Sequence, residues 1–327
     1  TGYSYDDLRR LLSSTQDLGG LEARTRYDYD VADRLVEIID PNNGTTSYRY
    51  DDLGNRLETA SPDTGITAYT HDRAGNLLTK TMASGTAEAV SLGYEYDALN
   101  RLTYVSTPDP LEDIAYVWDT CTYGLRRLCQ VTNGSSTVSY AYDSFGNVTD
   151  HQGVAYTHDR ANRVKTITYL SGAVLTYRYD LAGQVSDVDL TMDGQTQALA
   201  SAITHVPFGG IESLNYGNGR TLTQQWDLAY RLMGQSTPGV LSLDYTHYDG
   251  NGNLRQRDDS TTMPMITNDY SYDALNRLDT ASGPFGSNWG YDYDLNGNRT
   301  LGDEGAPVAL AYETNTNRLD AHGSEDV

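Results

Sequence analysis

Hydrophobic and polar side chains alternate along this chain with a period of two residues, not three or four. In the stretch that begins at Tyr94, Tyr94 and Tyr96 lie two residues apart, so they share one face of an extended strand. Leu102 and Tyr104 repeat this spacing after a short polar segment. The pattern predicts short β-strands nearly everywhere and favours helix almost nowhere.

The polar segment between the two runs predicts a tight turn. Asp97 opens it, because an aspartate carboxylate accepts hydrogen bonds from backbone N–H groups just ahead of it. Asn100 stands where other copies of the turn have Gly54, Gly75 or Gly146, so we expect a left-handed backbone at that position. Each unit is therefore predicted to be a β-hairpin.

This unit recurs along the whole chain. The pair Tyr-Asp appears at Tyr5-Asp6, Tyr29-Asp30, Tyr50-Asp51, Tyr96-Asp97, Tyr142-Asp143, Tyr179-Asp180, Tyr248-Asp249, Tyr272-Asp273 and Tyr293-Asp294. Degenerate copies fill the gaps, with Pro207 expected at the aspartate position of the most irregular one, and the spacing averages about 22 residues. We expect one domain over residues 1–327, built of antiparallel hairpins. Because a sheet of roughly 30 strands twists, we expect it to coil into a spiral, barrel or sandwich.

The composition refines this prediction. Of the 327 residues 38% are hydrophobic, with 27 Tyr and only 3 Phe, which suits a sheet face that stays partly wet. The formal net charge of −22 disfavours binding to nucleic acids and to anionic membranes. No apolar run is long enough to span a membrane. No phosphate-binding loop, nucleophile elbow or zinc motif appears, and we expect no cofactor.

Cys121 and Cys129 are the only cysteines, and they flank a turn at Tyr123-Gly124. If that turn closes a hairpin, the two residues lie within disulfide reach on adjacent strands. Two alternatives stay open, a disulfide or two free thiols. A disulfide would indicate an oxidising compartment.

Several segments resemble the RHS/YD-repeat family, whose members include bacterial RHS toxins, the B–C shells of Tc toxins and the teneurins. The segments that carry the resemblance most clearly are residues 50–57 and 291–299, and the repeats extend it over essentially the whole chain. It implies an all-β fold in which hairpins coil into a spiral, partly closed hollow shell. In the toxins of the family such a shell encloses a C-terminal cargo.

One feature of the toxins does not carry over. Their self-cleavage depends on an aspartate in the motif Asp-Pro-x-Gly-Leu, but Asp40-Pro41 and Asp109-Pro110 both lack the following Gly-Leu. We therefore do not expect self-cleavage. A chain made entirely of repeats contains no cargo of its own, which favours alternatives to encapsulation.

The candidate catalytic residues are histidines that replace tyrosine in the Tyr-Asp pair. His71, His158 and His205 stand in this position. Imidazole or phenol groups acting as acid and base, with arginine opposing a carboxylate, would suit β-elimination of a uronate-containing glycan. The competing interpretation is that histidine merely replaces tyrosine as a flat filler. Candidate substrate-binding residues under the lyase alternative are Trp118, Trp226, Arg73 and Arg160.

The segment from Asp249 to Asn253 is similar to the start of a calcium loop, but Leu254 and Ser260 stand where that loop needs Gly and Glu. We expect a turn there and no metal.

Three functions are therefore compared. The first is a structural YD-repeat shell segment of a bacterial RHS-type protein that encapsulates cargo or presents a surface. The second is a secreted polysaccharide lyase, and the third is a cell-surface adhesion or carbohydrate-binding module. The expected partners are a polysaccharide or an enclosed or cell-surface protein, with no nucleic acid and no membrane insertion. The resemblance implies a secreted or cell-surface location.

Overall fold

The computed structural model describes residues 1–283, 288–303, 307–322 and 325–326, and these residues form an all-β protein. Apart from strands, the described residues contain one short 3-10 helix, Pro110–Glu112. The strands are β1 (Gly2–Tyr5), β2 (Leu11–Gln16), β3 (Ala23–Tyr29), β4 (Leu35–Ile39), β5 (Thr45–Tyr50), β6 (Arg56–Ser61), β7 (Gly65–His71), β8 (Leu77–Met82), β9 (Val90–Tyr96), β10 (Leu102–Ser106), β11 (Ile114–Trp118), β12 (Leu128–Asn133), β13 (Ser136–Tyr142), β14 (Val148–His151), β15 (Val154–His158), β16 (Val164–Thr168), β17 (Val174–Tyr179), β18 (Val185–Met192), β19 (Gln195–His205), β20 (Ile211–Tyr216), β21 (Thr221–Trp226), β22 (Leu232–Thr237), β23 (Leu241–Tyr248), β24 (Leu254–Asp259), β25 (Ile266–Tyr272), β26 (Leu278–Ser282), β27 (Asn288–Gly290), β28 (Asp292–Tyr293), β29 (Arg299–Asp303), β30 (Pro307–Tyr312), β31 (Leu319–His322) and β32 (Glu325–Asp326).

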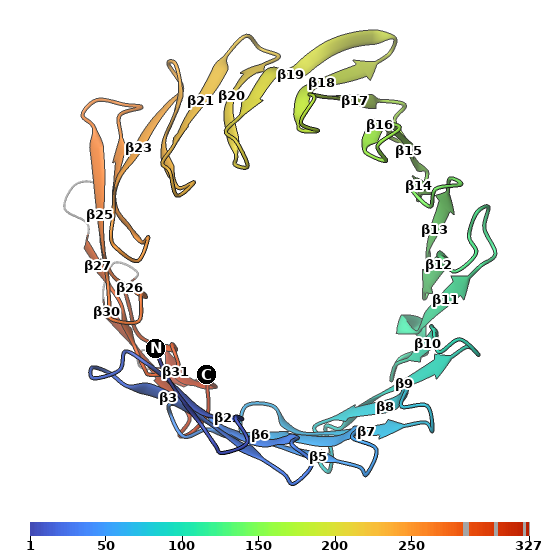
Figure 1. Cartoon of the computed structure of the whole chain (residues 1–327), viewed down its shortest axis with the longest axis vertical. Helices are drawn as coiled ribbons and strands as arrows, with labels where there is room; N and C mark the ends of the chain where they lie inside the picture. The colour runs from blue at the N-terminus through green and yellow to red at the C-terminus, as the bar shows by residue number, and fades with distance from the viewer. Residues whose placement is uncertain (284–287, 304–306, 323–324, 327) are drawn as a thin grey trace. The chain divides into compact units, whose positions relative to one another are not determined.

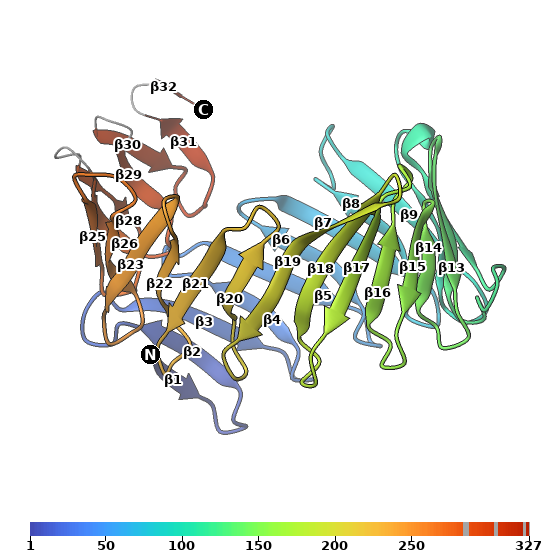
Figure 2. The same cartoon turned by 90° about the horizontal axis from the view of Figure 1, so that it is seen from above.

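The strands pair with their neighbours in sequence, and the pairing is antiparallel. Strands β1 to β27 belong to one 27-stranded sheet and β28 to β32 to a five-stranded sheet. Figure 1 shows the strands following one another in chain order, and Figure 2 shows the turns falling alternately on two edges. We call the edge with the Tyr-Asp turns the front edge and the opposite edge the back edge. The predicted succession of antiparallel hairpins is confirmed.

Each front turn is built by its aspartate. In the copy at Asp51, the backbone N–H of Asp51 donates to the Asn55 carbonyl at 2.9 Å, and the Gly54 N–H donates back to the Asp51 carbonyl at 3.1 Å. The Asp51 carboxylate accepts the N–H groups of Leu53 and Asn55, and its second oxygen accepts the Asn55 side chain at 2.8 Å. The turn is thus fastened by its first and last residues.

The left-handed position in these turns is also confirmed. The φ angles are 88° at Gly54, 86° at Gly75, 92° at Gly146 and 59° at Asn100. Glycine has no Cβ to clash in this region, and asparagine tolerates it.

One position in the irregular unit was predicted wrongly. The Val206 N–H donates to the Gly210 carbonyl at 3.1 Å, and Gly209 donates to the Val206 carbonyl at 3.0 Å. Val206 therefore takes the aspartate position, one residue before the expected Pro207. A proline could not supply the backbone N–H that closes this turn.

The sheet has almost no buried core. No large side chain of the described residues is fully buried, and the buried apolar residues are Ala23, Val105, Cys129, Ala173, Leu214, Ala281 and Leu310. The accessible surface is 20148 Å², whereas a compact protein of 36.0 kDa exposes about 13,000 Å². The strands therefore form a single layer, held mainly by hydrogen bonds and contacts between neighbouring strands.

The two faces of the layer differ. In β15, Val154, Tyr156 and His158 are half-buried while Ala155 and Thr157 are exposed. We call the face with the tyrosines the Tyr-bearing face. The alternation matches the period of two seen in the sequence.

By their internal contacts the residues divide into two compact units. The first contains residues 1–113 and 269–327, and the second contains residues 114–268. The interpretation of the whole chain as one domain stays a prediction. Within the first unit, early and late hairpins belong to one compact body.

Candidate functional site

Tyrosines that directly precede a front turn connect several of the hairpins to the one before. The hydroxyl of Tyr50 donates to the Leu35 carbonyl at 2.9 Å, and the hydroxyl of Tyr248 donates to the Leu232 carbonyl at 2.6 Å. Tyr29, Tyr142, Tyr179 and Tyr312 make the same bond. The recurring tyrosine is therefore a structural tether between repeats.

Arginine at the end of many front turns completes this connection. Arg34 pairs with its own Asp30 at 2.7 Å, donates to the Asp51 carbonyl of the next unit at 2.6 Å, and lies 5.2 Å from the ring centroid of Tyr50. One guanidinium thus makes an ion pair, a hydrogen bond and a cation–π contact at once.

These contacts also set the acidity of the turns. The pKa of the Asp51 carboxyl is lowered, first by the hydrogen bond from the Asn55 side chain. In Asp97 the largest cause of the lowered pKa is the hydrogen bond from the Arg101 backbone. In seven other turns the largest cause of the lowered pKa is likewise a hydrogen bond from the residue four places after the aspartate. These aspartates are Asp6, Asp30, Asp72, Asp143, Asp159, Asp227 and Asp249. Hydrogen bonds to a carboxylate favour its charged form.

The three predicted catalytic histidines lie in three different front turns. His71 ends β7, His158 ends β15 and His205 ends β19, each in the tyrosine position of its own front turn. His158 and His205 lie four strands apart, which corresponds to roughly 19 Å at the usual strand spacing. In each of the three, Nδ1 is buried and makes no hydrogen bond to any described residue.

The three histidines share one feature of their surroundings. The preceding front turns end in Asn55, Asn147 and Gln184, so no arginine lies at the end of the turn before them. Where the preceding turn ends in arginine, its guanidinium lies over the phenol ring of a tyrosine. Examples are Tyr50, Tyr179 and Tyr248. A cation over an imidazole would oppose its protonation, whereas a cation over a phenol ring is attracted to it.

The predicted substrate-binding residues are also dispersed. Trp226 donates its indole N–H to the Ile211 carbonyl at 2.9 Å, as a tyrosine would with its hydroxyl. Trp118 is half-buried at the end of β11, and Arg73 and Arg160 are exposed in two separate front turns. The assignment of these residues to glycan binding, like that of the histidines to catalysis, stays a prediction.

One of the histidines does line a depression. A cavity of about 410 Å³ on the Tyr-bearing face is lined by Tyr140, His151, Tyr156 and His158 with Val148 and Val164. Tyr140 and His151 are cross-strand partners whose rings stack with centroids 5.0 Å apart. The lining is aromatic and apolar, with no carboxylate and no arginine, so it lacks the charge opposition that uronate elimination needs.

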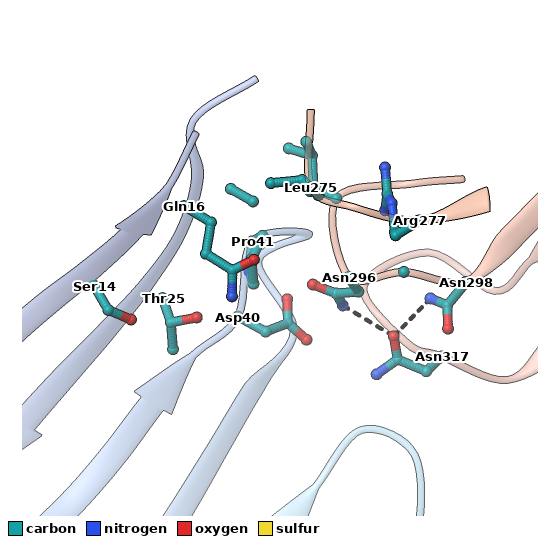
Figure 3. A pocket seen from close by; sticks show the side chains of 13 residues that line it. Ser14, Gln16, Thr25, Asp40, Pro41, Leu275, Arg277, Asn296, Asn298 and Asn317 are labelled. Carbon is teal, nitrogen blue, oxygen red and sulfur yellow. Dashed lines mark hydrogen bonds between the residues drawn. The ribbon is translucent and has the colours of Figure 1, made fainter. Parts of the chain in front are cut away.

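A cavity of about 510 Å³ in the first unit lies where late front turns meet early hairpins (Figure 3). Gln16, Ala23, Asp40 and Pro41 line it from the early hairpins. The late hairpins contribute Leu275, Arg277, Leu295, Asn296, Gly297, Asn298 and Asn317. We call the contact around this cavity the seam.

Carboxamides and carboxylates hold the seam together. The Asn42 side chain donates to the Asp294 carboxylate at 2.8 Å, and the Asn42 N–H donates to the Asn296 side-chain oxygen at 3.2 Å. Asn317 donates from its backbone and its side chain to the Asp63 carboxylate. In Figure 3 the side chains of Asn296 and Asn298 converge on Asn317.

The charged groups of the cavity take part in the turns that line it. One oxygen of the Asp40 carboxylate accepts the N–H groups of Asn42 and Gly44, and Arg277 bonds Asp273 and the Asp294 carbonyl. The contacts across the cavity therefore serve to join hairpins.

The sequence reasoning missed the seam. Asn42, Asp63 and Asn317 look like ordinary turn residues, because turns favour these types for their own geometry. Asn296 replaces the apolar residue found at the same place in the turns of Leu53 and Leu99, but Asn251 does the same in a turn outside the seam, so the sequence holds no clear signal of this contact.

Three further observations bear on chemistry. Cys121 and Cys129 form a disulfide with a Cα–Cα distance of 5.5 Å. Among the described residues, no group of three or more His, Cys, Asp or Glu is placed to hold a metal ion. In the same part of the chain, none of the helices has the length and apolarity to cross a membrane.

The family described as RHS Repeat matches residues 29–66 and 50–87. The chain therefore carries RHS repeats, and its resemblance to the RHS/YD-repeat family is confirmed. No curated protein sequence is significantly similar to the chain.

Solved structures match nearly the whole chain. The crystal structure of TcdB2-TccC3 superposes with a TM-score of 0.81 at 21% identity, covering 97% of this chain and 20% of its own. TcdB2-TccC3 without its hypervariable C-terminal region gives a TM-score of 0.81 at 21% identity, with coverages of 98% and 20%. The Tc holotoxin pore of Photorhabdus luminescens gives 0.79 at 20% identity, with coverages of 97% and 19%. The chain thus spans about a fifth of these chains and shares the fold of their shell.

Proposed function

We propose that this chain is a wall segment of an RHS-type shell and that its Tyr-bearing face contacts an enclosed polypeptide. The observation that supports this most strongly is the single layer without a core. Such a layer leaves one face rich in tyrosine uncovered, and both faces accessible to a partner. Tyrosine offers contact area and a hydroxyl on a side chain with few rotatable bonds, which suits binding to varied polypeptide surfaces.

The structural neighbours give this proposal its context. One of them is described with reference to a hypervariable C-terminal region, and the resemblance to the toxins implies that the shell encloses such a region. The disulfide between Cys121 and Cys129 supports an oxidising, extracellular setting, since disulfides persist there and are rare in the cytosol.

An unfolded polypeptide is the cargo state that this face suits best. A wall that accepts many sequences cannot depend on the shape of one folded surface. The exposed backbone and side chains of an unfolded chain can instead follow the tyrosine rows, which recur at every hairpin.

Binding to a matched pair of probes tests the proposal. The probes are a reduced, carboxymethylated protein that stays unfolded and its native form, both carrying the same fluorophore. We expect the fluorescence anisotropy of the unfolded probe to rise on titration with this chain, and that of the native probe to rise much less. Equal responses of the two probes, or none, would contradict the proposal.

A further inference from the structure

The cavity beside His158 is formed within one short part of the chain. Its volume is about 410 Å³, and all of the described residues that line it lie within residues 140–164. They belong to β13, β14, β15 and β16, four strands that follow one another in Figure 1. The second compact unit contains all of these strands. We call this cavity the aromatic cavity.

In other units of the repeat, a guanidinium lies over the ring that corresponds to His158. The arginine that ends one front turn lies 4.2 to 5.5 Å from the centroid of the tyrosine ring at the next turn in six described pairs. Arg163 over Tyr179 is the pair with the shortest distance, 4.2 Å. The hydroxyl of Tyr179 also reaches the Val164 carbonyl at 2.6 Å. Phenol and guanidinium thus fill this place together.

Both of these groups are replaced by shorter ones at the aromatic cavity. Asn147 ends the front turn before His158, and its side chain donates to the Asp143 carboxylate at 2.9 Å and to the Asn162 side-chain oxygen at 3.0 Å. An asparagine side chain is too short to reach over the next ring as an arginine does. The imidazole of His158 is in turn shorter than a phenol and has no hydroxyl. The two replacements together leave room on the Tyr-bearing face.

The lining of the aromatic cavity suits a planar cation. Tyr140 and Tyr156 contribute phenol rings, and His151 and His158 contribute imidazoles. The faces of aromatic rings attract cations, and a guanidinium is planar and weakly hydrated, so it stacks well on such rings. Of the described residues that line the cavity, none is an arginine or a lysine that would repel a second cation. The formal net charge of −22 also favours the approach of a cation.

We propose that the aromatic cavity binds the guanidinium of an arginine side chain from a partner, at the place where other units carry their own arginine. This inference rests on the proposed function and deepens it, because it names a side chain that an enclosed polypeptide inserts into the Tyr-bearing face. Lysine binds less well, since its ammonium is compact and strongly hydrated.

Fluorine NMR tests the proposal on the full chain. Fluorotyrosine is introduced at position 156, and the chain is titrated with N-acetyl arginine amide. We expect a saturable shift of the fluorine signal with a dissociation constant in the millimolar range, because a few cation–π contacts give weak binding. N-acetyl citrulline amide has nearly the same shape but no charge. We expect its dissociation constant to be at least about threefold higher.

A covered tyrosine provides the matched control. Fluorotyrosine at position 179 lies under the chain's own Arg163, so we expect no saturable shift there with either amide. The double variant Asn147→Arg/His158→Tyr restores the pair of residues that other units carry. With the probe at position 156, it should raise the dissociation constant for the arginine amide about threefold or more, because the cavity then holds its own guanidinium. Thermal melts establish that all variants are folded.

Three results would overturn the proposal. They are equal affinity for the arginine and citrulline amides, undiminished binding of the arginine amide to the double variant, and tighter binding of N-acetyl phenylalanine amide. The last of these would assign the cavity to apolar side chains. Binding of the arginine amide without any response of the unfolded probe would contradict the proposed function alone. A response of the unfolded probe without binding of the arginine amide would contradict this inference alone.

Discussion

At the scale of single residues, the Tyr-Asp pair is a connector. The aspartate closes its own turn, and the tyrosine reaches the preceding hairpin. Arginine, where present, adds a contact to both neighbours. The recurring Tyr, Asp and Arg residues therefore stabilise the hairpins and the contacts between them, and this role accounts for their recurrence in the sequence.

Tyr248→Phe tests the tether. The substitution removes the hydroxyl that donates to the Leu232 carbonyl at 2.6 Å but keeps the ring beneath Arg231. We expect the free energy of unfolding to fall by about 1 kcal/mol, the usual net contribution of one hydrogen bond. Tyr5→Phe is the control, because Tyr5 stands in the same pair but is 58% exposed. Equal losses in the two variants, measured by urea unfolding, would argue against the tether.

The turn carboxylates predict an acid-sensitive fold. Their pKa values in the folded chain are lowered from the ordinary value of 3.8, so the unfolded chain binds protons at a higher pH. Their contribution to stability is complete well above pH 3.8 and is lost as the pH falls through the lower folded values. We expect the urea midpoint to hold between pH 7 and about pH 5 and to drop steeply below about pH 4. A midpoint that is the same at pH 3 as at pH 7 would contradict this account.

At the scale of the hairpin, the sequence predicted most of the structure. The period of two predicted the strands, and the Asn/Gly position predicted the left-handed residue of each front turn, both from local physics. The irregular unit was misassigned by one residue, because Pro207 was aligned with the aspartate although the turn requires the N–H of Val206.

Gly54→Ala tests the left-handed position. Gly54 has a φ of +88°, and no atom lies near enough to clash with an added Cβ, so the cost comes from the backbone alone. We expect a loss of about 1 kcal/mol in the free energy of unfolding. Gly250→Ala is the matched control, since its surroundings are equally open and its φ is not in the left-handed region. A loss at Gly250 as large as at Gly54 would show that the φ angle is not the cause.

At the scale of the whole chain, the spacing of residues within each hairpin does not predict contacts between distant hairpins. The seam pairs Asn42 with Asp294 and Asp63 with Asn317, residues more than 250 positions apart. No local pattern specifies such a contact, because each residue is already justified by its own turn. The candidate lyase residues follow the repeat itself. A repeat places equivalent residues at intervals along the sheet, so His158 and His205 end different strands, β15 and β19.

Photo-cross-linking distinguishes the two faces of the layer and so tests whether the Tyr-bearing face takes up polypeptide. Benzoylphenylalanine is introduced at Tyr156, on the Tyr-bearing face, or at the adjacent Thr157, on the opposite face. Each variant is irradiated with the unfolded carboxymethylated probe. We predict strong cross-linking from position 156 and little from position 157. Equal cross-linking from both positions, or stronger cross-linking from 157, would contradict the claim.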